Sequence, residues 1–196
     1  MALFVKICGL ASPGAVSAAI GFDADMLGFT LYPTGPNPLT PVQAGALLAL
    51  VPSGTDRVGA FADAGDAQIG AVVAQGGLDL IQCDGAESPA RIRNLRATFK
   101  LPVIKSLRAT TVAELETAAT YKEADWLRFT ADSDVALLTG WRARRPWLID
   151  CAPDTAEIRR LAAAKAPAVN VIPGLAPDLA GTVAQIRAVL EAARAA

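Results

Sequence analysis

The run Phe4-Val5-Lys6-Ile7-Cys8-Gly9, near the start of the chain, decides how the rest of the sequence is interpreted. It is a short apolar stretch that ends in a thiol and a glycine, which is typical of a buried strand that opens into a loop. Loops that follow strands carry the ligand sites of parallel α/β proteins. Cys8 is therefore a candidate site residue, and the alternative is a small buried residue that closes the strand.

Short apolar runs of this kind alternate with Ala-rich helical stretches along the whole chain. Ser12, Thr40 and Ser88 each precede a proline, which is the pattern of a helix N-cap followed by proline at the first helical position. The alternation predicts strands at residues 3–7, 26–31, 57–61, 78–82, 102–107, 126–129, 146–149 and 168–172. It predicts helices at residues 13–20, 41–52, 66–75, 89–98, 111–121, 133–141, 154–165 and 177–193, with Asp132 or Ser133 capping the sixth.

The strand–helix alternation favours a (β/α)8 barrel. Near-continuous apolar strands separated by helices indicate a parallel sheet whose outer face is covered, and eight such units close naturally into a barrel. We expect a single domain that spans residues 1–196 with short loops. The alternative is an open doubly wound sheet, whose dinucleotide-binding form has little support because no GxGxxG motif follows the first strand.

Composition narrows the class of protein further. Hydrophobic residues make up 53% of the chain and charged residues 19%, which supplies a core and argues against disorder. A formal net charge of −1 gives no basic excess for nucleic acid, and no apolar run is long enough to cross a membrane. Three widely spaced cysteines and the lack of a signal peptide suggest the cytoplasm. The absence of histidine excludes Cys-His dyads, Ser-His-Asp triads and His-based metal sites.

Four stretches in the first part of the chain keep a recognisable order and spacing. They are Val5-Lys6-Ile7-Cys8-Gly9-Leu10, then Ala24-Asp25-Met26-Leu27-Gly28-Phe29 with Tyr32-Pro33, then Asp79-Leu80-Ile81-Gln82 with Gly85, Glu87, Ser88 and Pro89, and Val103-Ile104-Lys105. Together they resemble the phosphoribosylanthranilate isomerase family of tryptophan biosynthesis. The resemblance implies an Amadori rearrangement of an aminated phosphoribose by acid–base catalysis, without a metal or an organic cofactor.

The resemblance assigns the base to Cys8, which would remove the proton at the second carbon of the sugar. A thiol acts as a base when nearby positive charge favours its thiolate. Lys6 is expected on the same side of the first strand because side chains alternate with a two-residue period, and Lys105 is expected near the barrel interior.

The acid side of the site departs from the family. Thr130 falls where the family has an aspartate that protonates the ring oxygen, and Asp132, two residues later, is the other candidate acid. Asn37 replaces the family's arginine for the anthranilate carboxylate. Asp84 replaces a histidine that follows the strand-four glutamine, which is Gln82 here. Asn37, Gln82 and Asp84 are expected to contact substrate.

Anion binding is expected after strands five, seven and eight. The family's Gly-Gly pair after strand seven becomes Asp150-Cys151, and Gly174 remains as a backbone donor for phosphate after strand eight. Lys105 and Arg108, at the end of strand five, would either hold an anion or form a structural ion pair.

Two functions stay open from the sequence alone. The first is a phosphoribosylanthranilate-isomerase-like enzyme that acts on a small, phosphorylated substrate as a monomer or a homodimer. The second is a diverged barrel that has lost this activity and binds another small metabolite, such as an anion, or a protein partner.

Overall fold

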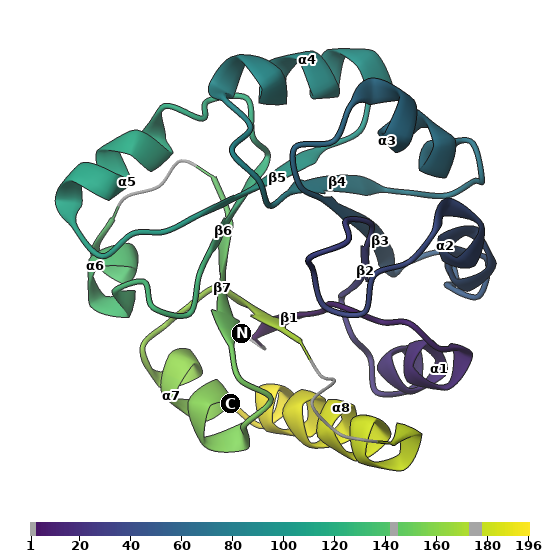
Figure 1. The fold of residues 1–196 in the computed structure, drawn as a ribbon. Helices are drawn as coiled ribbons and strands as arrows, with labels where there is room; N and C mark the ends of the chain where they lie inside the picture. Colours follow the sequence, from purple (N-terminus) through teal and green to yellow (C-terminus); the bar gives the residue numbers. More distant parts are fainter. Residues whose placement is uncertain (1–2, 142–144, 173–177) are drawn as a thin grey trace.

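The computed structural model of the chain describes residues 3–141, 145–172 and 178–196, and it forms a closed barrel of eight parallel strands (Figure 1). Each strand pairs with the next in chain order, and β8 returns to pair with β1, with Phe4 opposite Ala168. The strands are β1 Phe4–Ile7, β2 Met26–Thr30, β3 Asp56–Phe61, β4 Leu80–Cys83, β5 Val103–Leu107, β6 Trp126–Phe129, β7 Trp147–Cys151 and β8 Ala168–Val171. This confirms the predicted (β/α)8 barrel.

A helix follows each strand and covers the outside of the barrel (Figure 1). The helices are α1 Pro13–Gly21, α2 Pro41–Leu48, α3 Asp66–Val73, α4 Pro89–Phe99, α5 Val112–Ala119, α6 Val135–Gly140, α7 Thr155–Ala163 and α8 Leu179–Arg194. Over the described stretches, none of them has the length and apolar character that a membrane span needs.

Side-chain caps fix where most of these helices begin. Ser12, Thr40 and Ser88 cap α1, α2 and α4 as predicted, each accepting a hydrogen bond from a backbone N–H three residues later. The predicted cap of α6 is wrong, because the side chain of Asp134 caps it instead of Asp132 or Ser133. Asp132 therefore precedes the helix and stays in the loop after β6.

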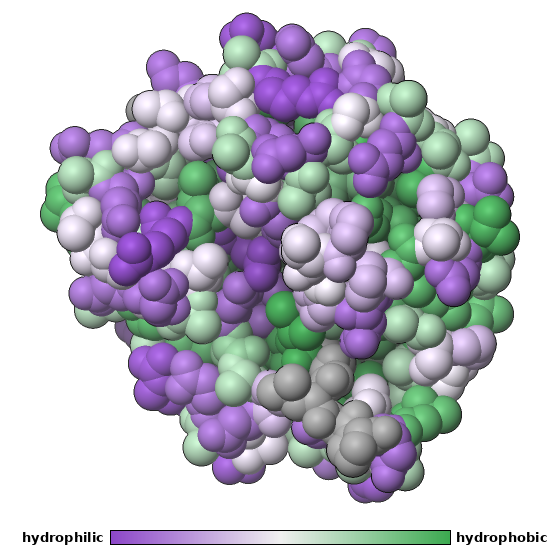
Figure 2. All heavy atoms as spheres, viewed as in Figure 1, coloured by the Kyte–Doolittle hydropathy of each residue, from purple (hydrophilic) through white to green (hydrophobic). Residues whose placement is uncertain are grey.

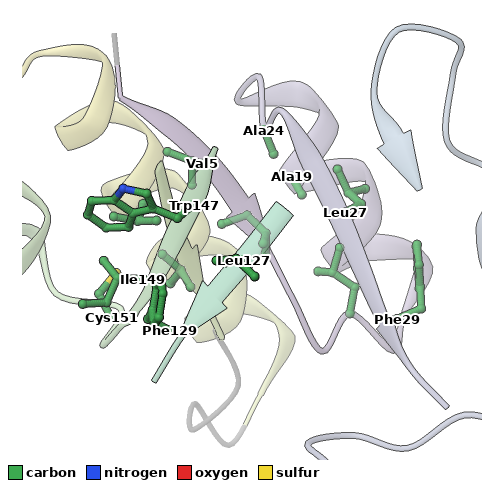
Figure 3. Packing of buried hydrophobic residues seen from close by; sticks show 14 of the residues in the cluster. Val5, Ala19, Ala24, Leu27, Phe29, Leu127, Phe129, Trp147, Ile149 and Cys151 are labelled. Carbon is green, nitrogen blue, oxygen red and sulfur yellow. The ribbon is translucent and has the colours of Figure 1, made fainter. Parts of the chain in front are cut away.

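Alternate residues along each strand face opposite sides of the sheet. One set, which includes Val5, Leu27, Leu127 and Ile149, packs outward in the main hydrophobic core (Figure 3). The other set fills the barrel interior, where an apolar layer lies near the amino ends of the strands: Phe4, Met26, Val58, Leu80, Ile104 and Trp126. This layer closes one end of the interior, so the opposite end is left for the site.

Candidate active site

Polar side chains replace apolar ones in the barrel interior toward the carboxyl ends of the strands. Six strands contribute one side chain each to what we call the interior polar layer: Lys6, Gln82, Ser106, Arg128, Asp150 and Asn170. Hydrophilic side chains also gather near the middle of the face shown in Figure 2. Active sites of (β/α)8 barrels lie at the carboxyl ends of the strands. We call this end of the barrel the mouth.

Cys8 lies in the mouth directly after β1, with 3% of its surface exposed. Gly9 then turns the chain with a φ of 77°, a backbone conformation that favours glycine. Gly28, on the neighbouring strand β2, has no side chain, and a Cβ there would lie 2.6 Å from Cys8 Sγ and 2.9 Å from Lys6 Nζ. The thiol and the ammonium therefore border the same small space.

Replacing Gly28 with alanine is expected to displace this pair. The new methyl group would overlap Cys8 Sγ and Lys6 Nζ, and even the Cα of Cys8 lies only 3.1 Å away. A displacement of about 1 Å at reacting groups can cost up to about 10²-fold, so we expect kcat/KM to fall by about tenfold to hundredfold. Gly21→Ala is the matched control, because a Cβ at Gly21 meets no atom within 4 Å. Full activity of Gly28→Ala would contradict the placement of the thiol and ammonium.

A chain of hydrogen bonds that crosses the barrel interior holds Lys6. Its Nζ donates to Asn170 Oδ1 at 2.7 Å, and Asn170 Nδ2 donates to Asp150 Oδ1 at 2.7 Å. Arg128 binds Asp150 as a fork, with Nε 2.7 Å from Oδ1 and Nη2 2.5 Å from Oδ2. Asp150 thus faces the interior, and its charge is paired with Arg128.

Asp84 is the second carboxylate of the mouth and the most heavily bonded one. It accepts hydrogen bonds from Tyr32 Oη at 3.1 Å, Gln82 Nε2 at 2.9 Å, Arg128 Nη1 at 2.8 Å and the Ser106 hydroxyl. Burial acts to raise the pKa of Asp84, but Arg128 and the hydrogen-bond donors outweigh it and hold the pKa below its ordinary value. Burial and the adjacent carboxylate raise the pKa of Tyr32, so its phenol keeps its proton.

Acidification is expected to weaken the fold through Asp84. Its folded pKa lies below the unfolded value of about 3.9, so its contribution to stability is fully present above that pH. The contribution is lost as the pH falls through the folded pKa. We therefore expect the free energy of unfolding to decline below about pH 4, and to decline less steeply in Asp84→Asn. Urea unfolding over a pH series measures how the free energy of unfolding depends on pH in the wild type and in Asp84→Asn. An equal dependence in the two proteins would refute the role assigned to Asp84.

Lys105 lies in a buried ion pair beneath the loop after β4. Its Nζ donates to Glu87 Oε2 at 2.8 Å, to the Gly85 carbonyl at 2.6 Å and to the Cys83 carbonyl at 3.2 Å. The Lys105 side chain is 2% exposed and that of Glu87 is 4% exposed. An ammonium has three donors, and all three are occupied here. Of the two alternatives for Lys105, the geometry fits the structural ion pair.

The rim of the mouth holds the residues predicted for the acid side. Thr130 Oγ1 donates to Asp132 Oδ1 at 2.6 Å, and Arg108 Nε lies 2.7 Å from Asp132 Oδ2. The hydroxyl of Thr130 and the charge of Arg108 lower the pKa of Asp132. Across the mouth, Asn37 Nδ2 donates to the Gly9 carbonyl at 3.0 Å and ties the loop after β2 to the loop after β1.

One further predicted site residue and the two other cysteines remain. Gly174, expected to bind phosphate, lies outside the described residues. Cys83 and Cys151 are buried, and burial is the main cause that raises the pKa of each thiol to about 12. Among the described residues, no group of three or more His, Cys, Asp or Glu side chains is placed to hold a metal ion.

Sequence reasoning missed four members of the mouth: Tyr32, Ser106, Arg128 and Asn170. Arg128 could have been recognised from the sequence, because it is a charged residue between Leu127 and Phe129 in an otherwise apolar strand. Such a residue needs a partner when the strand is buried. Strand parity places Arg128 on the inner face, but the register between strands was needed to find Asp84 and Asp150 beside it.

Fold and site together define the class of this protein: a (β/α)8 barrel whose polar mouth holds a lysine from the first strand and the cysteine that directly follows that strand. The family model described as N-(5'-phosphoribosyl)anthranilate (PRA) isomerase matches residues 5–136. The isomerase of Rhodospirillum rubrum is 41% identical over 164 residues, covering 74% of this chain and 75% of that protein. The chain belongs to the PRA isomerase family.

Two more comparisons extend over almost the whole chain. The PRA isomerase of Paramagnetospirillum magneticum is 32% identical over 212 residues, covering 99% of this chain and 98% of that protein. A crystal structure of a PRA isomerase in complex with reduced 1-(o-carboxyphenylamino)-1-deoxyribulose 5-phosphate superposes with a TM-score of 0.87. The two chains are 23% identical, and the superposition covers 99% of this chain and 100% of the other. This similarity supports the fold.

Proposed function

We propose that the mouth of this barrel isomerises N-(5'-phosphoribosyl)anthranilate, a step of tryptophan biosynthesis, in the cytoplasm. Membership of the family supports this function, and no comparison supports the alternative of a barrel that has lost it. The observation that carries the proposal is the Cys8 thiol, which shares a small space with the Lys6 ammonium at the end of β1. This is where the family's base is expected.

The reaction divides between the two sides of the mouth. An acid protonates the oxygen of the ribose ring, the ring C–O bond breaks, and a Schiff base forms between the sugar and the aromatic nitrogen. Cys8 as thiolate then removes the proton at the second carbon. The electron pair of that C–H bond forms an enolamine, which becomes the aminoketone product when the first carbon takes a proton and the hydroxyl of the second carbon gives one up. The Lys6 ammonium beside Cys8 favours the charged sulfur that the second step requires.

The rim cluster of Thr130, Asp132 and Arg108 is our proposal for the acid side. Thr130 stands at the position of the family's aspartate, and its hydroxyl contacts Asp132. A carboxyl whose pKa is lowered is ionised near neutral pH and seldom carries a proton to donate, so this side lacks an efficient general acid. The side chains of Arg108 and Asp132, which form an ion pair, are each 58% exposed. Exposed pairs exchange partners at little cost, so Arg108 is free to bind the substrate's carboxylate.

Restoring the family's acid is therefore expected to raise the rate. Thr130→Asp places a carboxyl at the end of β6, and a well-placed acid contributes about 10²–10⁴-fold in established cases. We expect kcat to rise by about tenfold, because the surrounding loop is adapted to threonine. Loss of substrate fluorescence measures the rate. A folded variant with unchanged or lower kcat would show that the acid side lies elsewhere.

Binding of a product analogue tests the proposed function without turnover. The probe is reduced 1-(o-carboxyphenylamino)-1-deoxyribulose 5-phosphate, which the solved relative binds. We expect calorimetric binding by the wild-type chain and weaker binding by Arg108→Ala, because the substrate's carboxylate loses its cation. Arg187→Ala, which breaks an exposed pair on α8, is the matched control. No binding by the wild-type chain would contradict the proposed function.

A further inference from the structure

We propose that Arg128 is a positioning residue that holds Lys6 beside Cys8 by fixing Asp150 and, through it, the amide of Asn170. The catalytic meaning of this role rests on the proposed function, but the contacts do not. The chain runs from Arg128 to Asp150, Asn170 and Lys6 in hydrogen bonds of 2.5–2.7 Å. It links β6, β7, β8 and β1, and it ends at the space shared with the thiol.

The orientation of the Asn170 amide is the central link. In its ion pair with Arg128, the Asp150 carboxylate only accepts hydrogen bonds, so Asn170 must turn its NH2 group toward it. The carbonyl oxygen of the amide then faces Lys6 and accepts its ammonium. A flipped amide would present N–H donors to an ammonium, which is also only a donor. The ionised carboxylate of Asp150, which the fork holds in place, thus determines which side of the amide Lys6 meets.

Burying the charge of an arginine at this position is unfavourable, so the contacts of Arg128 must offset that penalty. Its side chain is 12% exposed, and removing a charge from water carries a large free-energy penalty before any pairing. Arg128 offsets this with Asp150 on one side and with Asp84 and Ser106 on the other. A guanidinium presents five N–H donors in a rigid plane, and four contacts are used here. A lysine in its place keeps the charge but loses the fork.

The surroundings of the thiol include ionisable groups from several elements. Lys6 comes from β1 itself, Tyr32 from the loop after β2 and Arg128 from β6, and Tyr32 and Arg128 both contact Asp84. A test must therefore separate the position of Lys6 from the total charge of the mouth. Arg128→Lys does so because it keeps every charge and changes only the geometry.

The readout is the ultraviolet absorbance of the Cys8 thiolate at a fixed, near-neutral pH, measured without substrate. Cys83 and Cys151 are silent there because burial raises the pKa of each to about 12. Subtracting Cys8→Ser isolates the signal of Cys8. Arg57→Lys is the matched control: Arg57 also forms a fork, with Nε 2.8 Å and Nη2 3.0 Å from the oxygens of Asp79, but at the amino end of β3.

We expect Arg128→Lys to lower the thiolate fraction of Cys8 by about fivefold and Arg57→Lys to leave it unchanged. Asn170→Leu breaks the chain at its central link, keeps the ionisable residues and should lower the fraction by a similar factor. In the Asn170→Leu background, Arg128→Lys should have no further effect, because coupled residues do not act additively. An unchanged thiolate fraction in both single variants, or two effects that simply multiply, would overturn the proposal.

Failure of this proposal and failure of the proposed function are distinguishable. The thiolate signal needs no turnover, so it can change in Arg128→Lys even in a protein that does not isomerise the substrate. If the wild-type chain is active, Arg128→Lys should lower kcat with little change in KM. A positioning residue acts on the base and not on substrate binding. A rise in KM alone would assign Arg128 to substrate binding and contradict the proposal.

Discussion

Replacing Cys8 with alanine is expected to lower kcat/KM for phosphoribosylanthranilate by about 10²–10⁴-fold, the contribution of a positioned acid or base. The thiol shares a small space with the Lys6 ammonium, and alanine cannot accept a proton. The loss should appear in kcat, because the thiol acts on the proton at the second carbon and not on the phosphate or carboxylate of the substrate. The fall in substrate fluorescence, followed at several substrate concentrations, separates kcat from KM.

Cys83→Ala is the matched control for the cysteine prediction. Cys83 is 1% exposed and packs in the main core, outside the polar layer. Its replacement should cost some stability through the small cavity it leaves, with activity retained. A Cys8→Ala protein that turns over at the wild-type rate would contradict the role of the thiol.

Replacing Lys105 with methionine is expected to cost about 3–5 kcal/mol of stability, the range for breaking a buried ion pair by removing one partner. Glu87 would be left as an uncompensated charge with 4% of its side chain exposed, and two backbone carbonyls would lose their donor. For a chain of this size, each kcal/mol shifts Tm by about 2–4 °C, so the melting curve should move by roughly 6–20 °C. Thermal and urea unfolding both measure the change.

Arg187→Met is the control for Lys105→Met. Arg187 pairs with Glu191 one turn away on α8, and the two side chains are 61% and 58% exposed. Such pairs contribute about 0.3–0.5 kcal/mol. If Lys105→Met keeps its stability and loses affinity for the product analogue, Lys105 binds substrate, which is the other alternative that the sequence left open.

The barrel was predictable because its signals are local. Each strand is a short apolar run, and pairs such as Ser88-Pro89 mark the start of a helix within two residues. Parity within β1 was enough to put Lys6 on the same side as Cys8. The cap of α6 was missed because Asp132, Ser133 and Asp134 are all competent caps in sequence, and only the backbone distinguishes them.

The pairing inside the mouth was not predictable, because it depends on the register between strands. Asp84 and Arg128 are 44 residues apart, and a one-residue slip would turn either side chain to the outer face. The same holds for Asn170 and Lys6, which are 164 residues apart. Sequence motifs identified residues of the family pattern, such as Cys8 and Lys6. The residues that hold them in place, such as Arg128 and Asn170, could be identified only from the three-dimensional structure.

Turnover of phosphoribosylanthranilate by the purified wild-type chain tests the central claim most directly. The account predicts a loss of substrate fluorescence that saturates with substrate concentration, scales with protein concentration and is inhibited by the reduced product analogue. A folded protein with which the fluorescence falls no faster than in buffer alone, at every substrate concentration, would contradict the account.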